Sequence, residues 1–320
     1  MKLILLTSDQ TKPLNLPSDI MEDKSIINPD TLTYSKLVAF FKLTKFRLSI
    51  LVVFSAVVSY ITIYPKSFDY QHILSLAIGG FLVTASANSF NQVIEKNLDK
   101  LMSRTQARPL PLEILSPIEA LLFALLCGGV GSWLIFEFTN ELCGILSVLS
   151  IALYALVYTP LKRITPFSVF VGAIPGALPT LIGALAGEEG FGSFHMYPLL
   201  LFTIQFFWQF PHFWAIAWVA DDDYRKAGFR LLPSGGGKDH NTSIQIMTYT
   251  LFLLPLGLIP AWIGLTGINS AVIVTLCGVG FLSQTFSLMK TGSNQSALRI
   301  MFGSFLYLPI VQIAYLLDKV

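Results

Sequence analysis

The chain has 320 residues, of which 53% are hydrophobic and only 12% are charged, and its net charge at neutral pH is +2. Soluble domains carry about 25% charged residues, so this composition excludes an ordinary soluble protein and predicts a polytopic membrane protein. So small a net charge gives no reason to expect a nucleic-acid partner. The three cysteines, Cys127, Cys143 and Cys277, lie far apart in apolar runs, which excludes a disulfide framework or a cysteine metal site.

The first 33 residues are polar and contain three prolines. They lack the apolar core of a signal peptide, and their acidic residues and absence of arginine disfavour a transit peptide. We expect residues 1–33 to form a poorly ordered cytoplasmic tail and residues 34–320 to form one membrane domain. Residues 34–47 are amphipathic and basic, which predicts a segment lying along the membrane surface.

Nine apolar runs follow, each of about the length that crosses a bilayer as a helix. Several contain glycine or proline, which membrane helices tolerate. The predicted fold class is therefore all-α, a polytopic membrane helix bundle with nine transmembrane helices. The runs cover residues 48–65, 72–94, 117–137, 140–158, 167–186, 197–219, 243–264, 268–289 and 297–317.

The lysines and arginines predict the orientation. If the N-terminus is cytoplasmic, all of the 21 except Lys66 and Lys319 fall on the cytoplasmic side. Cytoplasmic loops carry an excess of lysine and arginine, so this orientation is strongly favoured. Nine spans then place the C-terminus outside. The chemically rich loops all lie inside, where a water-soluble anionic group would bind.

An oxygen-rich face is predicted at the end of the second run. If the helix continues, Asn91, Glu95 and Asp99 lie within about 80° of arc on one face. Carboxylates at the edge of an apolar span are functional candidates, and hard oxygens suit Mg²⁺ bridging to phosphates. The cations just beyond suit the phosphates themselves: Lys96, Lys100, Arg104 and Arg108. The alternative is a solvated helix end held by pairs four residues apart.

Two further cytoplasmic loops carry charge. The segment after the sixth run holds Asp221, Asp222 and Asp223, followed at once by Arg225 and Lys226. Adjacent carboxylates repel one another and a cation relieves this, although pairing within the helix is the alternative. The loop between the fourth and fifth runs carries Lys162 and Arg163, which suit a departing diphosphate or merely anchor the loop inside.

A histidine lies deeper in the sixth run. His212 is flanked by Trp208, Phe213 and Trp214, which resembles the wall of a pocket for a large flat ligand. Histidine is a common porphyrin-iron ligand, but also a common residue at helix-packing contacts. The sequence leaves both interpretations open.

Three stretches together resemble the UbiA-type intramembrane prenyltransferases, in particular the branch of that family that prenylates haem. The resemblance covers roughly residue 43 to the C-terminus. Its motifs are Asn91-x3-Glu95-x3-Asp99 with Met102-x-Arg104-Thr105-x2-Arg108-Pro109-Leu110, then Tyr158-Thr-Pro-Leu-Lys162-Arg163 with Gly172-x3-Gly176, and Trp208-Gln-x-Pro211-His212 with Asp222-Asp223-Tyr224.

The chain departs from the family pattern at a few positions. Glu95 stands where many members have aspartate, and Phe210 stands where proline is frequent. Asp221, Asp222 and Asp223 are adjacent rather than spaced by four, which leaves open which of them serves a second metal ion.

The resemblance implies a helical bundle around a central cavity in a bacterial inner membrane. It implies transfer of a farnesyl group from farnesyl diphosphate to a vinyl group of haem B, with Mg²⁺ as cofactor and haem A synthase as a downstream consumer. The implied catalytic and metal-binding residues are Asn91, Glu95, Asp99, Asp222 and Asp223. The implied diphosphate ligands are Arg104, Arg108, Lys162, Arg163 and Arg225, and the implied haem pocket is His212, Trp208 and Tyr224.

Two alternatives remain. Another acceptor, a hydroxybenzoate or a naphthoate, would keep the first motif but would not need the segment from Trp208 to Tyr224. A transporter or haem-binding membrane chaperone would place its site near the midplane, often with internal repeats. The chain shows no repeat, and its acidic residues cluster at the cytoplasmic edge, which favours an enzyme. A prenyl donor longer than farnesyl also stays open.

Overall fold

The computed structural model describes residues 29–64, 69–188, 196–235 and 237–320. Most of the predicted cytoplasmic tail, residues 1–28, lies outside the described residues. The first described helix, α1 (Pro29–Leu43), begins five residues earlier than the predicted surface segment. It ends at Leu43, and α2 (Phe46–Ile63) begins after a two-residue turn, so the predicted segment 34–47 is divided between two helices.

The prediction of nine spans is confirmed for the described part of the chain, which contains nine helices long and apolar enough to cross a membrane and no sheet. Their bounds lie within a few residues of the predicted runs at most ends. They are α2, α3 (Tyr70–Asp99), α4 (Pro117–Phe138), the continuous α5 (Glu141–Ala152), η2 (Leu153–Tyr158) and α6 (Thr159–Leu161), α7 (Ser168–Leu185), α8 (Met196–Val219), α10 (His240–Trp262), α11 (Ile268–Thr291) and α12 (Asn294–Leu317).

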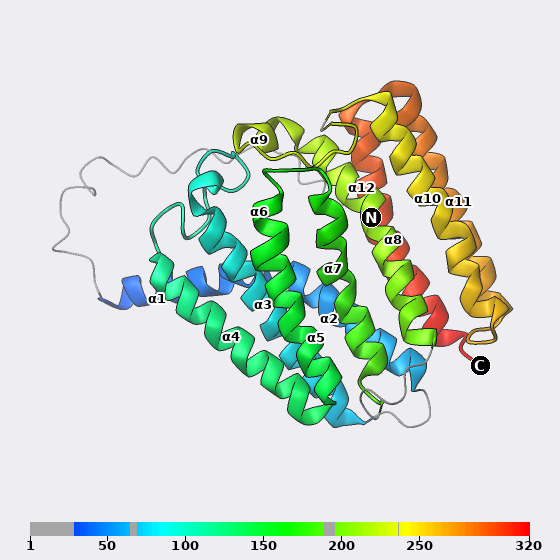
Figure 1. Cartoon of the computed structure of the whole chain (residues 1–320), viewed down its shortest axis with the longest axis horizontal. Helices are drawn as coiled ribbons and strands as arrows, with labels where there is room; N and C mark the ends of the chain where they lie inside the picture. Colours follow the sequence, from blue (N-terminus) through cyan, green and yellow to red (C-terminus); the bar gives the residue numbers. More distant parts are fainter. Residues whose placement is uncertain (1–28, 65–68, 189–195, 236) are drawn as a thin grey trace, which may run out of the picture.

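The spans pack as two connected groups. α2, α3, α4, α5 and α7 contact one another in sequence, and α8, α10, α11 and α12 form the second group. The groups join where α7 packs on α8 and α12 packs on α2. Figure 1 shows α4 at one side of the molecule and α10 and α11 at the other, with the spans running between two ends.

Small residues allow the closest approaches between spans, as expected where lipid supplies no hydrophobic drive for helix association. A Cβ added at Gly79 of α3 would lie 2.9 Å from the carbonyl oxygen of Gly131 in α4. A Cβ at Gly183 of α7 would collide with the carbonyl group of Ala56 in α2. These glycines therefore fix how closely α3 can approach α4 and how closely α7 can approach α2.

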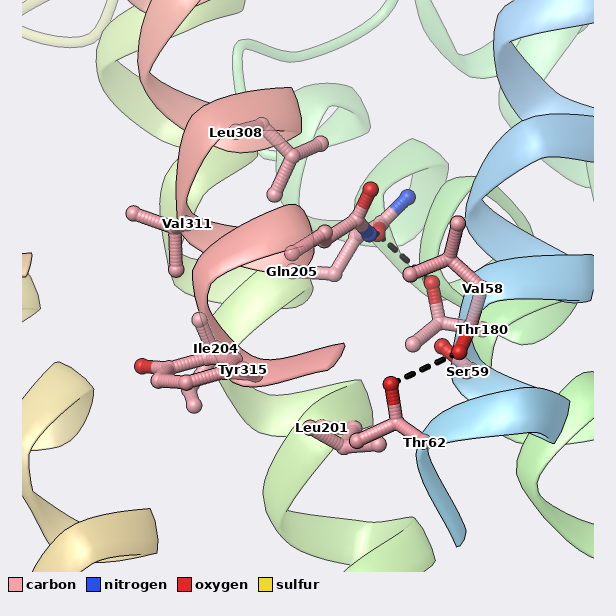
Figure 2. A pocket seen from close by; sticks show the side chains of 11 residues that line it. Val58, Ser59, Thr62, Thr180, Leu201, Ile204, Gln205, Leu308, Val311 and Tyr315 are labelled. Atoms are coloured by element: carbon pink, nitrogen blue, oxygen red, sulfur yellow. Dashed lines mark hydrogen bonds between the residues drawn. The ribbon is translucent and has the colours of Figure 1, made fainter. Parts of the chain in front are cut away.

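A chain of buried hydrogen bonds ties the two groups together in the middle of the bundle. Thr180 of α7 donates to Gln205 of α8 at 2.6 Å, and Gln312 of α12 donates to the same oxygen at 3.0 Å. Ser55 of α2 donates to Gln312 at 3.1 Å. Figure 2 shows Thr180 and Gln205 facing each other beside a cavity of about 20 Å³, room for about one water molecule.

The segments predicted to carry chemistry gather at one end of the bundle. The end of α3 and the loop after it, α6, and α9 (Asp221–Lys226) all lie at the top of Figure 1. α3 has 30 residues and is about 45 Å long, which exceeds the thickness of a bilayer core of about 30 Å. Its last turns can therefore project beyond the apolar layer while remaining helical.

Candidate active site

The oxygen-rich face predicted on α3 is formed, because the helix continues without a break to Asp99. The side chains of Asn91, Glu95 and Asp99 are all buried, at 3%, 3% and 0% exposure. Asn91 donates to Thr159 of α6 at 3.0 Å. Three buried oxygen-bearing residues thus share one helix face at the charged end of the bundle.

Each carboxylate on this face has its own cation. Arg108 Nη1 donates to both carboxylate oxygens of Asp99, at 2.9 and 2.8 Å. Lys162 forms an ion pair with Glu95. The predicted solvated helix end is therefore not what forms, because these pairs join α3 to two other segments and are withdrawn from water. Both cations belong to the predicted diphosphate set.

Lys162 is buried between aromatic rings. Its ammonium lies 5.1 Å from the ring centre of Tyr158 and 4.9 Å from that of Phe229. Burial lowers the pKa of Lys162, and the nearby charge of Glu95 only partly opposes this. Breaking the pair would leave a charge in a poorly hydrated place, so an incoming anion is a favourable new partner for Lys162.

A widened helical turn places Lys162. η2 is a π-helical turn, a feature that often marks functional sites. Pro160, two residues after the end of η2, cannot donate the amide hydrogen that a regular helix needs there. The Tyr154 and Tyr158 rings of this turn lie 5.2 Å apart, close enough to Glu95 for its charge to act on both. Neither tyrosine was predicted from the sequence to have a role in the site.

Lys45 is a further residue of the site that sequence reasoning missed, having counted it only toward orientation. It adopts φ +48°, a left-handed conformation that is costly for a residue with a side chain and that tends to persist at functional sites. Burial and the charges of Arg108 and Lys162 lower the pKa of Lys45 to about 7, against the opposing pull of Glu95 and Asp99. Its positive backbone angle was not visible in the sequence.

The second acidic cluster is held by partners of its own. Asp221 pairs with Arg225 at 2.8 Å, and Asp222, whose side chain is 84% exposed, lies 3.8 Å from Lys238. Asp223 accepts hydrogen bonds from the backbone of Ser103 and Arg104, and from the Ser103 hydroxyl at 2.8 Å. The pairing within and beside α9, left open by the sequence, is the arrangement that the structure shows.

Asp223 joins α9 to the loop after α3. Burial raises the pKa of this carboxyl, but the hydrogen bonds from Arg104, Ser103 and Lys226 outweigh burial and hold the pKa well below its usual range. Arg104 adds a second connection, since its guanidinium lies 5.4 Å from the ring centre of Tyr224 and donates to its hydroxyl at 3.3 Å. Arg163, by contrast, is exposed at the surface of its loop.

The predicted haem-pocket residues fall into two places. His212 lies 2.7 Å from the Ser304 hydroxyl and stacks on Trp208, whose ring nitrogen donates to the Ser304 carbonyl at 3.0 Å. This contact joins α8 to α12, as the helix-packing interpretation of His212 expects. Tyr224 lies instead on α9 against Arg104.

The residues of α3 suit Mg²⁺, although the full predicted metal set is not assembled. No three His, Cys, Asp or Glu side chains in the described part of the chain are grouped so as to hold one metal ion. Mg²⁺ is usually bound through one or two carboxylates and substrate phosphates, which Glu95 and Asp99 with the Asn91 amide oxygen can provide. Asp222 and Asp223 have other partners, and an ion shared with α3 would require them to move.

These features define a class of protein: a polytopic membrane enzyme whose site, at one end of the bundle, is built to receive an anionic group. Comparison with known families agrees. The profile of the UbiA prenyltransferase family matches residues 52–308. The chain therefore belongs to the UbiA prenyltransferase family and is a prenyltransferase, as the resemblance of its motifs predicted.

Among relatives, the protoheme IX farnesyltransferase of Cytophaga hutchinsonii is 49% identical over 288 residues, covering 89% of this chain and 99% of the relative. That of Christiangramia forsetii is 42% identical over 304 residues, covering 93% and 98%. The solved structure of a digeranylgeranylglyceryl phosphate synthase has a TM-score of 0.73 at 19% identity, covering 88% of this chain and 98% of that one. A UbiA homologue from Archaeoglobus fulgidus, bound to GPP and Mg²⁺, has a TM-score of 0.61 at 14% identity, covering 87% and 99%.

Proposed function

We propose that this protein is a haem O synthase that transfers a farnesyl group from farnesyl diphosphate to a vinyl group of haem B. The observation that carries the proposal is the pairing of two buried carboxylates, Glu95 and Asp99, with two cations, Lys162 and Arg108. Such a set can exchange partners, because the cations can take a diphosphate while the carboxylates take a metal ion. The protoheme IX farnesyltransferase relatives support haem as the acceptor.

The leaving group is the part of the substrate that this site fits best. Lys162, Arg108 and Lys45 would neutralise the negative charge that grows on the diphosphate as the bond to the farnesyl carbon breaks. Arg104, Arg163 and Arg225, which are exposed, are further proposed diphosphate ligands. Mg²⁺ bound at Asn91, Glu95 and Asp99 would supply additional charge neutralisation, and the A. fulgidus homologue bound to GPP and Mg²⁺ supports this.

Departure of the diphosphate leaves an allylic cation. The rings of Tyr158 and Phe229 lie against Lys162, and Tyr154 packs on Tyr158; these rings would keep water away from this carbocation. The π electrons of the haem vinyl group then form the new carbon–carbon bond. Water adds to the resulting cation and loses a proton, which gives the hydroxyethylfarnesyl side chain. We propose farnesyl as the donor chain, with a longer prenyl chain as the alternative.

We propose that haem approaches from the α8 side, with Trp208 and His212 as one wall and Tyr224 as a further contact. Because His212 contacts Ser304, its role would be to position that wall. The orientation proposed is N-terminus cytoplasmic and C-terminus outside, in a bacterial inner membrane. The site then faces the compartment that holds diphosphate substrates, and haem A synthase would take the product.

The direct test is an assay of the purified, lipid-reconstituted protein with Mg²⁺, radiolabelled farnesyl diphosphate and one acceptor at a time. We expect label to enter haem B with stoichiometric release of diphosphate, and a Glu95→Gln variant to bind haem without transferring the label. Labelling of a hydroxybenzoate or naphthoate in place of haem would overturn the acceptor. Haem binding with no diphosphate release by the unmodified protein would overturn the enzyme assignment in favour of a haem carrier.

A further inference from the structure

A second cavity lies beside the charged end of the bundle, outside the site described above. It has a volume of about 690 Å³, within the range of about 300–1,000 Å³ typical of small-molecule sites. Its walls come from α1, the end of α3, the loop that follows and the start of α4. The lining residues used below are Lys36, Lys96, Lys100, Leu112, Glu113 and Glu119.

The cavity faces away from the oxygen-rich side of α3. Lys96 and Lys100 follow Glu95 and Asp99 by one position each, which is about 100° around the helix. They are one turn apart and therefore extend to the same side. These two lysines were predicted from the sequence to suit the phosphates of the substrate, but they line this second cavity instead.

The charges of the cavity favour a singly charged anion. Lys36 lies 2.6 Å from Glu119, and Lys100 lies 3.0 Å from Glu113. Glu119 is also committed to α4, because its other oxygen accepts from the Ser116 amide in a capping box. Among the ion pairs of the described residues none involves Lys96, so three lysines face two glutamates and one positive charge is left uncompensated.

Exposed apolar side chains flank the cavity. Leu37 and Phe41 of α1 are exposed, at 64% and 54%, beside the wall that Lys36 supplies. Leu112, at the edge of the cavity, is 55% exposed. Apolar side chains beside lysines at the end of a bundle are what a lipid requires, with its headgroup among the cations and its acyl chains along the exposed apolar residues.

We propose that this cavity binds the phosphate headgroup of an anionic phospholipid from the adjacent leaflet of the bilayer. Lys36, Lys96 and Lys100 surround the phosphate, and Leu112 contacts the glycerol region. The bound lipid fastens α1 to the loop of residues 101–116. That loop also carries Arg104 and Arg108, so the lipid steadies the segment that reaches Asp99, whatever the acceptor of the reaction is.

Native mass spectrometry of the full chain in detergent tests this, with phosphatidylglycerol as the probe. The Lys96→Gln variant removes the lysine that lacks an ion pair, and Lys290→Gln, an exposed lysine at the end of α11, is the matched control. We expect Lys96→Gln to weaken binding of one phosphatidylglycerol at least fivefold, Lys290→Gln to leave it unchanged, and phosphatidylcholine to bind weakly to all forms.

If Lys96→Gln fails to fold, Lys100→Gln serves as a second test. The partner of Lys100, Glu113, is largely exposed, so this ion pair contributes little to stability and its loss should be tolerated. Equal binding of phosphatidylglycerol by all variants would show a non-specific lipid shell and overturn the proposal. Displacement of the lipid by inorganic phosphate alone at the same concentration would show a site for free phosphate and would also overturn it. Prenyl transfer by Lys96→Gln is measured in the same detergent preparation. Failure of the lipid proposal can then be told apart from failure of the proposed activity.

Discussion

At the scale of single residues, the candidate site is a set of opposite charges that neutralise one another in pairs. The sequence predicted which residues carry these charges, because oxygen-bearing side chains four apart share a helix face. It could not predict that Arg108 would bind Asp99 or that Lys162 would bind Glu95, since these pairs join segments through the tertiary fold. Lys45 was missed for the same reason.

The Asp99–Arg108 pair should be needed for stability as well as for activity. Arg108→Gln leaves a fully buried carboxylate without its partner, and breaking such a pair costs about 3–5 kcal/mol. We expect a clearly lower Tm in detergent, with most of the loss recovered in the Asp99→Asn/Arg108→Gln double variant, and no prenyl transfer by either protein. A double variant as unstable as the single one would show that the pair is not what holds the two segments.

The lowered pKa of Lys45 predicts that the protein takes up a proton when diphosphate binds at the site. The pKa of about 7 makes the ligand-free side chain mostly neutral at pH 8, and a bound diphosphate favours the ammonium. Because this pKa is lowered from that of the unfolded chain, the contribution of Lys45 to folding stability increases with pH between about 7 and 10.5.

Calorimetric titration with Mg²⁺ and diphosphate at pH 8, in buffers of different ionisation enthalpy, measures the proton directly. We expect uptake of about one proton by the unmodified chain, as a group with a pKa near 7 requires, and markedly less by Lys45→Met. The same proton count in both proteins would assign the uptake to another group.

At the scale of elements, helix length and helix irregularity build the site. The end of α3 was predictable from the continuing pattern of Asn91, Glu95 and Asp99, whereas the π-helical turn before Lys162 was not. The Tyr158 ring of this turn packs against α7 at Gly172. A Cβ added at Gly172 of α7 would lie 2.6 Å from the Tyr158 ring, so a residue without a side chain is needed there.

Gly172→Ala should therefore impair catalysis without touching any charged group. Displacing Tyr158 shifts Lys162, and misplacement by about 1 Å can lower a rate by about a hundredfold. We expect the prenyl-transfer rate to fall at least tenfold, with Gly129→Ala, where an added Cβ meets nothing within 4 Å, as the control at normal rate. Unchanged rates in both variants would argue against a positioning role for this turn.

In α9 the sequence showed which residues are acidic but not what their partners are. Three adjacent aspartates were predicted to include a metal ligand, yet in the structure Asp223 holds the loop after α3 through Ser103 and Arg104. A run of carboxylates looks the same in a sequence whether its partners are metal ions or backbone amides. Which of Asp221, Asp222 and Asp223 binds metal when substrate is present stays a prediction.

At the scale of the whole molecule, composition predicted the fold class and the nine spans, because the bilayer dictates helix length and apolar character. The pairing of the spans into two groups depends on glycine contacts and on the Thr180–Gln205–Gln312 chain, which no periodicity reveals. The asymmetric placement of lysine and arginine predicts orientation, a property of the membrane rather than of the fold.

The orientation is tested by reporter fusions at the C-terminus in bacteria. With nine spans and a cytoplasmic N-terminus, alkaline phosphatase fused after Val320 should be active and green fluorescent protein fused there should be dark. A fusion in the loop of residues 227–239 is the control and should give the reverse pattern. Fluorescence at the C-terminus would require an even number of spans or an inverted protein.

The central claim is most directly tested by extracting haems from bacterial membranes that contain this protein and separating them by chromatography and mass. We predict a new haem that is heavier than haem B by a hydrated farnesyl group. It should be absent from membranes with equal amounts of inserted Asp99→Asn protein, because that variant loses the charge that pairs with Arg108. Haem B alone in both membranes, despite folded protein and available farnesyl diphosphate, would contradict the assignment.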